Sequence, residues 1–135
     1  MKVLLSIKPE FAEMILHGKK KYEFRRTIFK SPSIKTVVLY ASSPVCRIIG
    51  EFEIDRILEL DIDSLWEKTS RYAGIDKPFY DRYFDGKETG YAIKVKSAKR
   101  YQRYRKLEDY DLKRPPQSFA YIYSVAGAAL QGCPT

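Results

Sequence analysis

Four residues near the start of the sequence follow the pattern GxKxxExR: Gly18, Lys20, Glu23 and Arg25. Residues 22–26 have the aromatic content of a short strand, in which successive side chains alternate between faces. Glu23 and Arg25 therefore share one face, where they form an ion pair or jointly present an acceptor and donors to a ligand. Lys20 can add a third charged group from the preceding turn. The same stretch is also typical of a solvated edge strand with a surface ion pair.

A helix is expected directly before this charged group. Pro9 suits the first helical position, where its missing N–H is not needed, and Gly18 suits the residue of positive φ that ends a helix. Phe11, Met14 and Ile15 have helical spacing and are expected to face the core. The charged side chains that follow the helix are therefore expected to project from one tight turn.

Further strands are expected over residues 36–40, 46–60, 89–95 and 119–123, which are rich in β-branched and aromatic residues. The alternation of apolar and charged residues within 46–60 favours a strand with one buried face. Gly50 interrupts that strand and indicates a bulge or a close approach of another backbone segment.

Two short helices are expected in the middle of the chain. Asp61 or Asp63 suits the N-cap of the first helix, and Asp76 suits the N-cap of the second. Two helices joined by a glycine turn are the outline of a helix-turn-helix unit, whose DNA-reading helix would carry only Lys77 and Arg82 against three aspartates. A packing role is therefore favoured, and DNA reading stays open as an alternative.

Composition limits the function classes. A net charge of +8 and a pI of about 9.4 favour a polyanionic partner, although a merely soluble basic protein has the same composition. The length and the 44% hydrophobic content suit one domain. Cys46 and Cys133 lack metal-ligand spacing and predict free thiols, so neither a metal nor a cofactor is expected. No apolar run approaches the roughly 18 residues of a membrane span, and a cytoplasmic protein without membrane contact is expected.

The pattern GxKxxExR resembles the signature of the ASCH domain family, which is related to PUA domains. Residues 5–9, 40–44 and 115–119 follow in the matching order and are similar to a bacterial and archaeal ASCH subgroup of predicted transcriptional regulators. The resemblance covers residues 1–123 and implies an α+β fold, a small, mostly antiparallel PUA-like β-barrel with a few short helices covering its ends. Residues 124–135 predict a loose C-terminal tail.

The resemblance also implies a cleft suited to RNA or a modified nucleobase. Residues 97–106 contain no acidic residue, and tyrosines alternate with basic residues along them. This pattern is typical of a strand that contacts RNA and equally of a strand that is merely exposed to solvent. Residues 42–43 and 117–118 offer hydroxyl and amide groups that would complete the cleft. The positions predicted to contact nucleic acid or ligand are Lys20, Tyr22, Glu23, Arg25, Ser42, Ser43, Lys94, Lys96, Arg100, Arg103, Gln117 and Ser118.

The leading interpretation is an RNA-binding module that recognises RNA or a modified nucleotide in a basic cleft around GxKxxExR. In this cleft Lys20 and Arg25 meet phosphate or a base carbonyl, and Glu23 accepts a hydrogen bond from an exocyclic amine. The resemblance equally allows an RNA-directed hydrolase, a ribonuclease or an N4-acetylcytidine amidohydrolase, with Lys20 as base or nucleophile and Glu23 as proton shuttle. A DNA-binding regulator is a further alternative, and the sequence does not determine the oligomeric state.

Overall fold

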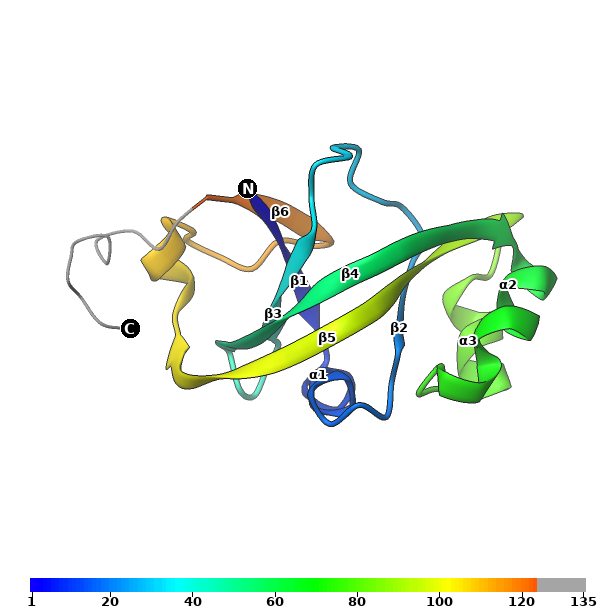
Figure 1. The fold of residues 1–135 in the computed structure, drawn as a ribbon, viewed down its shortest axis with the longest axis horizontal. Helices are drawn as coiled ribbons and strands as arrows, with labels where there is room; N and C mark the ends of the chain where they lie inside the picture. The colour runs from blue at the N-terminus through cyan, green and yellow to red at the C-terminus, as the bar shows by residue number, and fades with distance from the viewer. Residues whose placement is uncertain (124–135) are drawn as a thin grey trace.

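Two long antiparallel strands, β4 (Arg47–Asp61) and β5 (Thr89–Arg105), form the framework of the computed structural model, which describes residues 1–123 (Figure 1). Their register shifts beside Gly50. A Cβ atom at Gly50 would lie 2.5 Å from the backbone carbonyl oxygen of Lys99, so only glycine lets the two strands approach this closely. The predicted long strand and its close backbone approach are confirmed.

Four shorter strands extend this pair: β1 (Lys2–Ile7), β2 (Tyr22–Arg25), β3 (Thr36–Ala41) and β6 (Phe119–Ile122). The six strands form one mixed sheet with the order β2-β5-β4-β3-β1-β6, in which β1 and β3 run parallel and the other neighbours antiparallel. Parallel neighbours need a crossover connection, and the segment between β1 and β3 supplies it.

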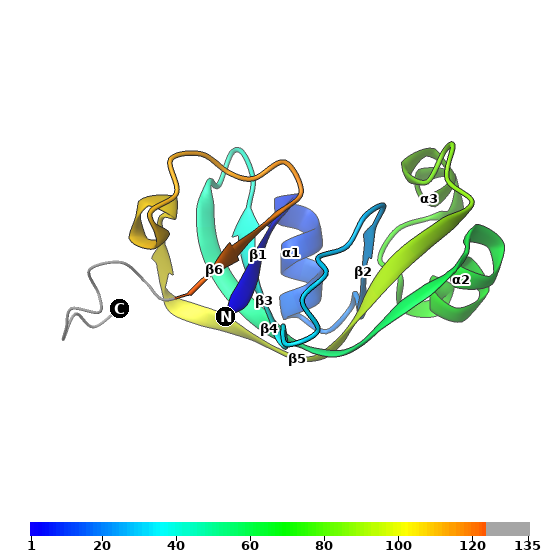
Figure 2. The ribbon, with the colours of Figure 1, turned by 90° about the horizontal axis from the view of Figure 1, so that it is seen from above.

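The sheet is not closed into a barrel and is mixed, so the expectation of a mostly antiparallel barrel was wrong. A barrel requires backbone pairing all the way round, but β2 and β6 remain the two edges of this sheet. The helix α1 (Pro9–Leu16) packs between the β1–β3 part of the sheet and β2 and fills the space that strand pairing would close (Figure 2). A side chain links the two edges instead, because Arg25 donates from Nη2 to the carbonyl oxygen of Ser118 at 2.6 Å.

α1 begins and ends where the sequence predicts. Pro9 occupies its first turn, and Gly18 follows it with a φ of +78°. Ala12 and Ile15 are buried against the sheet, and Phe11 packs partly buried at the edge of the same cluster. The helix therefore ends at a sharp corner, from which residues 19–21 lead directly into β2.

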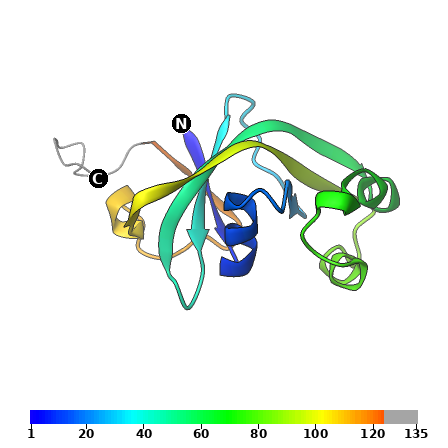
Figure 3. The same ribbon diagram turned by 60° about the horizontal axis from the view of Figure 1, so that its bottom comes forward.

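The connection between β4 and β5 holds two further helices, α2 (Ile62–Thr69) and α3 (Lys77–Tyr83), which lie beyond one end of the long strand pair (Figures 1 and 3). The Asp61 carboxylate accepts from the Ser64 N–H at 3.0 Å, and the Asp76 carboxylate accepts from the Phe79 N–H at 2.9 Å. Both predicted N-caps are thus confirmed. Two 3₁₀ helices complete the described elements, η1 (Ser70–Tyr72) and η2 (Leu107–Tyr110).

Apolar side chains gather on both sheet faces and beneath the helix pair. One cluster fills the space between α1 and the sheet, and a second lies on the opposite face around Leu4, Tyr40 and Tyr101. The third cluster joins α2 and α3 to β2 through Tyr80 and Phe24, whose rings meet edge to face at 5.3 Å. This third cluster fixes α3 beside β2, which determines the wall of the site described next.

The predicted loose tail and Cys133 lie outside the described residues. Cys46, within them, is exposed at the turn between β3 and β4. Within residues 1–123, each helix is too short or too polar to cross a membrane.

Candidate functional site

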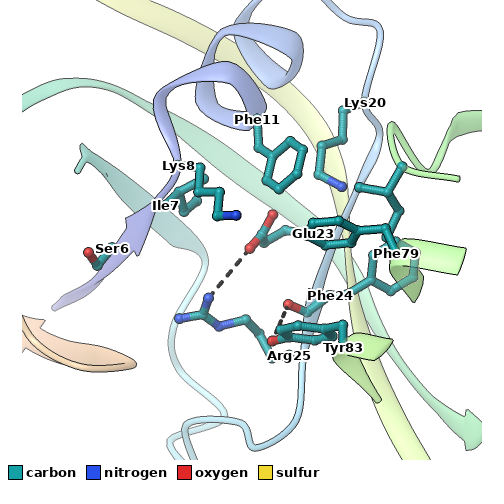
Figure 4. Close-up of a pocket in the computed structure, with 11 residues that line it drawn as sticks. Ser6, Ile7, Lys8, Phe11, Lys20, Glu23, Phe24, Arg25, Phe79 and Tyr83 are labelled. Carbon is teal, nitrogen blue, oxygen red and sulfur yellow. Dashed lines mark hydrogen bonds and ion pairs between the residues drawn. The ribbon is translucent and has the colours of Figure 1, made fainter. Parts of the chain in front are cut away.

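A cavity of about 280 Å³ lies where β2, the start of α1 and the helix α3 meet (Figure 4). Its volume is slightly below the ~300–1,000 Å³ range of small-molecule pockets and suits a group the size of one nucleotide rather than a folded polymer. Charged and aromatic side chains line it together. The lining residues are Ser6, Ile7, Lys8, Phe11, Lys20, Glu23, Phe24, Arg25, Ile75, Phe79 and Tyr83.

Lys20 is almost fully buried, with 2% of its surface exposed. Its Nζ donates to the carbonyl oxygen of Ala73 and lies 5.2 Å and 5.1 Å from the ring centres of Phe11 and Phe24. Burial lowers the pKa of the Lys20 ammonium, and the nearby Glu23 carboxylate partly opposes this shift. Because an ammonium has three donors, Lys20 retains donor capacity for a ligand after bonding Ala73.

Glu23 is buried in the centre of the close-up view, between Arg25 on one side and Lys20 on the other (Figure 4). Burial raises the pKa of its carboxyl group, and the charges of Lys20 and Arg25 oppose that shift. Its Oε2 lies 3.5 Å from Arg25 Nη1, a long contact for a charged pair. The Glu23 carboxyl group therefore keeps acceptor capacity that a ligand can use.

Arg25 extends from β2 on the same side as Glu23, as the strand alternation predicts. Its guanidinium joins Glu23 to the carbonyl oxygen of Ser118, which precedes β6. Two of its five N–H groups are engaged in this way, and its side chain is 12% exposed. Arg25 is therefore held in place while still presenting donors at the cavity.

Aromatic rings form the opposite wall. Phe11 of α1 and Phe79 of α3 meet edge to face with ring centres 5.4 Å apart. Tyr83 donates from its hydroxyl to the carbonyl oxygen of Phe24 at 3.0 Å, which fixes its ring beside β2. Lys8, exposed at the start of α1, places its Nζ 5.3 Å from the Phe79 ring centre. The cavity thus offers ring faces for a planar group and several charged groups for its polar edge.

The chemistry of this arrangement is hydrogen bonding and proton transfer. Within residues 1–123 there is no cluster of three or more His, Cys, Asp or Glu side chains that could hold a metal ion. Burial lowers the pKa of Lys20 and raises the pKa of Glu23, so it shifts both groups toward their neutral forms. Such a pair can hold a donor–acceptor edge of a ligand, or accept and donate protons in a reaction.

The structure brings together the charged residues of GxKxxExR and separates other predicted positions from them. Lys20, Glu23 and Arg25 line the cavity, and Ser118 joins them through its backbone carbonyl. Tyr22 instead lines a hollow on the other face of β2. Tyr22 and Glu23 are neighbours in β2 and alternate between its faces, whereas Phe24, on the Tyr22 face, still borders the cavity.

The predicted serines and glutamine lie outside the cavity lining. Ser42 bonds the carbonyl oxygen of Ile7 through its N–H at 2.9 Å, and Ser43 is exposed in the following turn. Gln117 is exposed next to Ser118. The Ser42 N–H bond joins the end of β3 to β1, but neither Ser42 nor Ser43 lines the cavity.

The four predicted basic positions of β5 fall into two groups, two in ion pairs and two exposed. Lys94 pairs with Asp55 at 3.5 Å, and Arg100 pairs with Glu13 of α1. Lys96 and Arg103 are exposed. None of these four residues lines the cavity of Lys20, so the basic strand is a separate surface rather than an extension of the cleft.

Several cavity residues did not emerge from the sequence as site residues. Phe11 was expected in the core, and the sequence analysis assigned no site role to Phe79 or Tyr83. The sequence analysis likewise assigned no site role to Lys8. The sequence offers one local signal. Lys8 directly precedes the helix and Lys20 follows it in the next turn, so the two amines could reach the same space.

Gly74 contributes to the site through the absence of a side chain. Its φ is +72°, and a Cβ atom there would lie 2.8 Å from Cγ of Lys20. The sequence indicates only a glycine turn between the two helices, whereas the structure shows that Gly74 makes room for the buried stem of Lys20.

Comparison with known proteins identifies related domains. The model of the ASCH domain matches residues 5–110. An ASCH domain-containing ribonuclease of Zymomonas mobilis is 32% identical over 125 residues, which cover 88% of this chain and 82% of that protein. A crystal structure of ASCH from Zymomonas mobilis superposes with a TM-score of 0.82 at 31% identity, covering 90% of this chain and 87% of that chain.

A second relative is much longer. Large ribosomal subunit protein uL22 of Ureaplasma parvum is 27% identical over 120 residues, which cover 89% of this chain but only 39% of that protein. The chain therefore spans about two fifths of this relative. The expected subgroup of predicted transcriptional regulators finds no support among these matches.

Proposed function

Because this chain belongs to the ASCH domain family, we propose that it binds RNA by holding one unstacked nucleotide in the cavity around Lys20, Glu23 and Arg25. The observation that carries the proposal is the buried carboxyl group of Glu23, which has unused acceptor capacity between two cations and faces aromatic rings. Buried polar groups are normally satisfied, so a group that presents free capacity to a cavity suits a ligand.

The cavity chemistry matches the edge of a nucleobase. Glu23 accepts from an exocyclic amine, Lys20 donates to a ring nitrogen or carbonyl, and the faces of Phe11 and Phe79 pack against the base. A base in an A-form duplex is not accessible to such a cavity, so the expected partner is a single-stranded or looped segment. The net charge of +8 supports an anionic polymer.

Hydrolysis of RNA in the same cavity is a second candidate. It is favoured by the relative from Zymomonas mobilis, which is an ASCH domain-containing ribonuclease, and by the lowered pKa of Lys20. A neutral Lys20 would take the proton of an attacking hydroxyl or water, a protonated Glu23 would return a proton to the leaving group, and Arg25 would stabilise the oxyanion. An amidohydrolase acting on N4-acetylcytidine would use the same roles.

One incubation series tests both candidates. Labelled single-stranded and structured RNA pools, cytidine and N4-acetylcytidine are incubated with the unmodified protein, and bound fraction and product are recorded together. Lys20→Met removes the amine but keeps the stem that packs against Gly74, and Glu23→Gln removes the charge but keeps the shape. Lys19→Met is the matched control, because Lys19 is an exposed lysine of the same turn.

Binding that is lost in Lys20→Met and Glu23→Gln, kept in Lys19→Met and unaccompanied by product supports the binding proposal. Product that is lost in Lys20→Met and Glu23→Gln but kept in Lys19→Met supports hydrolysis, with binding as the step that captures the substrate. Thermal unfolding of each variant separates loss of the site from loss of the fold. Absence of RNA binding and of product at low salt would contradict both candidates.

A further inference from the structure

The charged groups of the cavity divide into two sides. Figure 4 shows Lys20 and Arg25 on opposite sides of Glu23, with Lys8 on the Arg25 side. The Lys8 Nζ also lies 5.3 Å from the Phe79 ring centre, so Lys8 borders the aromatic wall as well. Ser6 lies beyond Lys8, farther from the aromatic wall. A base packed against the rings would therefore leave its sugar and any attached group facing Lys8 and Arg25.

Lys8 has the properties of a ligand-binding cation. It lines the cavity although it is exposed, its Nζ points toward Glu23 (Figure 4), and this atom lies over the Phe79 ring, 5.3 Å from the ring centre. Among the ion pairs found within residues 1–123, none involves Lys8. The contact with Phe79 limits the positions that the flexible stem can adopt, which reduces the entropy lost when a ligand binds.

The four charged residues that line the cavity carry a net charge of +2 in either of two states of Lys20 and Glu23. With both groups ionised, Lys8, Lys20 and Arg25 oppose the single charge of Glu23. With both neutral, Lys8 and Arg25 remain. A neutral nucleoside would leave this charge uncompensated in a partly desolvated space, whereas a phosphate monoester carries about −1.5 to −2 at neutral pH and would balance it.

We propose that Lys8 and Arg25 form a phosphate subsite and that the cavity holds a terminal nucleotide of RNA bearing a phosphate monoester. This inference rests on the proposed function, which it narrows from any unstacked nucleotide to a phosphorylated end. The single charge of an internal phosphodiester compensates only half of the excess. Arg25 offers its remaining guanidinium N–H groups to the phosphate oxygens, and Lys8 adds an ammonium from the mouth of the cavity.

The test compares ligands that differ only in the phosphate. Affinities of the four nucleosides, their 5′- and 3′-monophosphates and the corresponding methyl phosphodiesters are measured by calorimetry on the full chain. For the preferred base, we expect one monophosphate to bind about tenfold or more tightly than the nucleoside, with the methyl ester between them. Inorganic phosphate at the same concentration is expected to compete only weakly, because it lacks the base.

Variants of Lys8 provide the second arm. Lys8→Met keeps the apolar stem over Phe79, and it should weaken monophosphate binding about tenfold while leaving nucleoside binding unchanged. Lys77→Met is the matched control, since Lys77 is an exposed lysine of α3 that pairs with Asp81 at 2.9 Å and does not line the cavity. It should leave both affinities unchanged.

Four results would overturn the inference. Equal binding of nucleoside and monophosphate to the unmodified protein would remove the phosphate subsite and leave the proposed function standing. Equal weakening of both ligands by Lys8→Met would show that Lys8 supports the cavity as a whole. Competition by inorganic phosphate as strong as that by the nucleotide would indicate a plain anion site. If nucleosides, monophosphates and RNA all fail to bind, the proposed function falls together with the inference.

Discussion

Lys20 and Glu23 are two buried ionisable residues that share one environment. Burial disfavours the charged form of each, so the pKa of Lys20 falls while that of Glu23 rises, and their mutual attraction opposes both shifts. Apolar side chains of similar volume would be easier to bury at these positions. A pair of ionisable groups held in a cavity with unused hydrogen-bonding capacity is better explained by ligand binding than by stability.

Glu23→Gln is predicted to change how stability depends on pH. Because the folded-state pKa of Glu23 lies above its ordinary value of 4.5, the folded state binds more protons than the unfolded state between these two values. The contribution of Glu23 is therefore fully present below pH 4.5 and is lost as the pH rises through the folded-state pKa. We expect the melting temperature of Glu23→Gln to rise relative to the unmodified protein over this interval.

Thermal unfolding of both proteins between acidic and neutral pH measures this difference. Glu13 and Glu51 have lowered pKa values and act in the opposite direction, but they are common to both proteins and cancel in the comparison. A difference in melting temperature that stays constant with pH would show that burial does not raise the Glu23 pKa.

At the scale of elements, the loop between η1 and α3 and the turn after α1 are built as one unit. Lys20 reaches from the turn to the carbonyl oxygen of Ala73, and the Lys21 N–H bonds the carbonyl oxygen of Tyr72 at 2.9 Å. Gly74 gives the Lys20 stem its space. The turn and the loop therefore depend on each other's exact path, although more than fifty residues separate Lys20 from Ala73.

Gly74→Ala should destabilise the protein more than Gly86→Ala. Both glycines have positive φ, where alanine costs about 1–2 kcal/mol. A Cβ atom at Gly86 meets nothing within 4 Å, whereas one at Gly74 lies 2.8 Å from Lys20 Cγ, so we expect a further ~1–3 kcal/mol from overpacking. Chemical denaturation of the two variants measures both free energies of unfolding.

The double variant Gly74→Ala with Lys20→Ala tests the cause. Removal of the Lys20 stem relieves part of the overpacking. The destabilisations of the two single variants should therefore add up to a value about 0.5 kcal/mol or more above the destabilisation of the double variant. Strict additivity would mean that the backbone conformation alone accounts for the effect at Gly74.

At the scale of the whole molecule, the predicted basic positions of β5 form a surface separate from the cavity. The long strand β5 carries the basic run that the sequence singled out, and two of its cations are paired with acidic groups of other elements, Lys94 with Asp55 and Arg100 with Glu13. Lys96 and Arg103 are exposed. If an RNA strand follows β5, these last two residues should contribute most to its affinity.

Lys96→Ala combined with Arg103→Ala is predicted to weaken RNA binding more than Lys94→Ala combined with Arg100→Ala. Loss of two contacts to phosphates of single-stranded RNA should reduce the magnitude of the slope of log RNA affinity against log salt concentration by about 1.4. Titrations at several salt concentrations measure the slope for both double variants, which lose the same charge. Indistinguishable slopes would indicate that RNA does not follow this strand.

Local patterns in the sequence determined the elements that carry the site. The helix at Pro9, its end at Gly18, the N-caps Asp61 and Asp76 and the strand alternation that places Glu23 beside Arg25 were all predictable. Each depends on backbone hydrogen bonds and side-chain directions within a few residues, which the sequence specifies directly.

Only the tertiary structure decided how these elements meet. The sheet stays open because α1 fills the space between its edges, and Arg25 links those edges through a carbonyl 93 residues away. The same packing brings Lys8 and Phe79 to the cavity of Glu23 and leaves Ser42 and Ser43 outside its lining. These contacts join segments far apart in the chain, and their geometry follows from how apolar surfaces pack against one another, which no local pattern encodes.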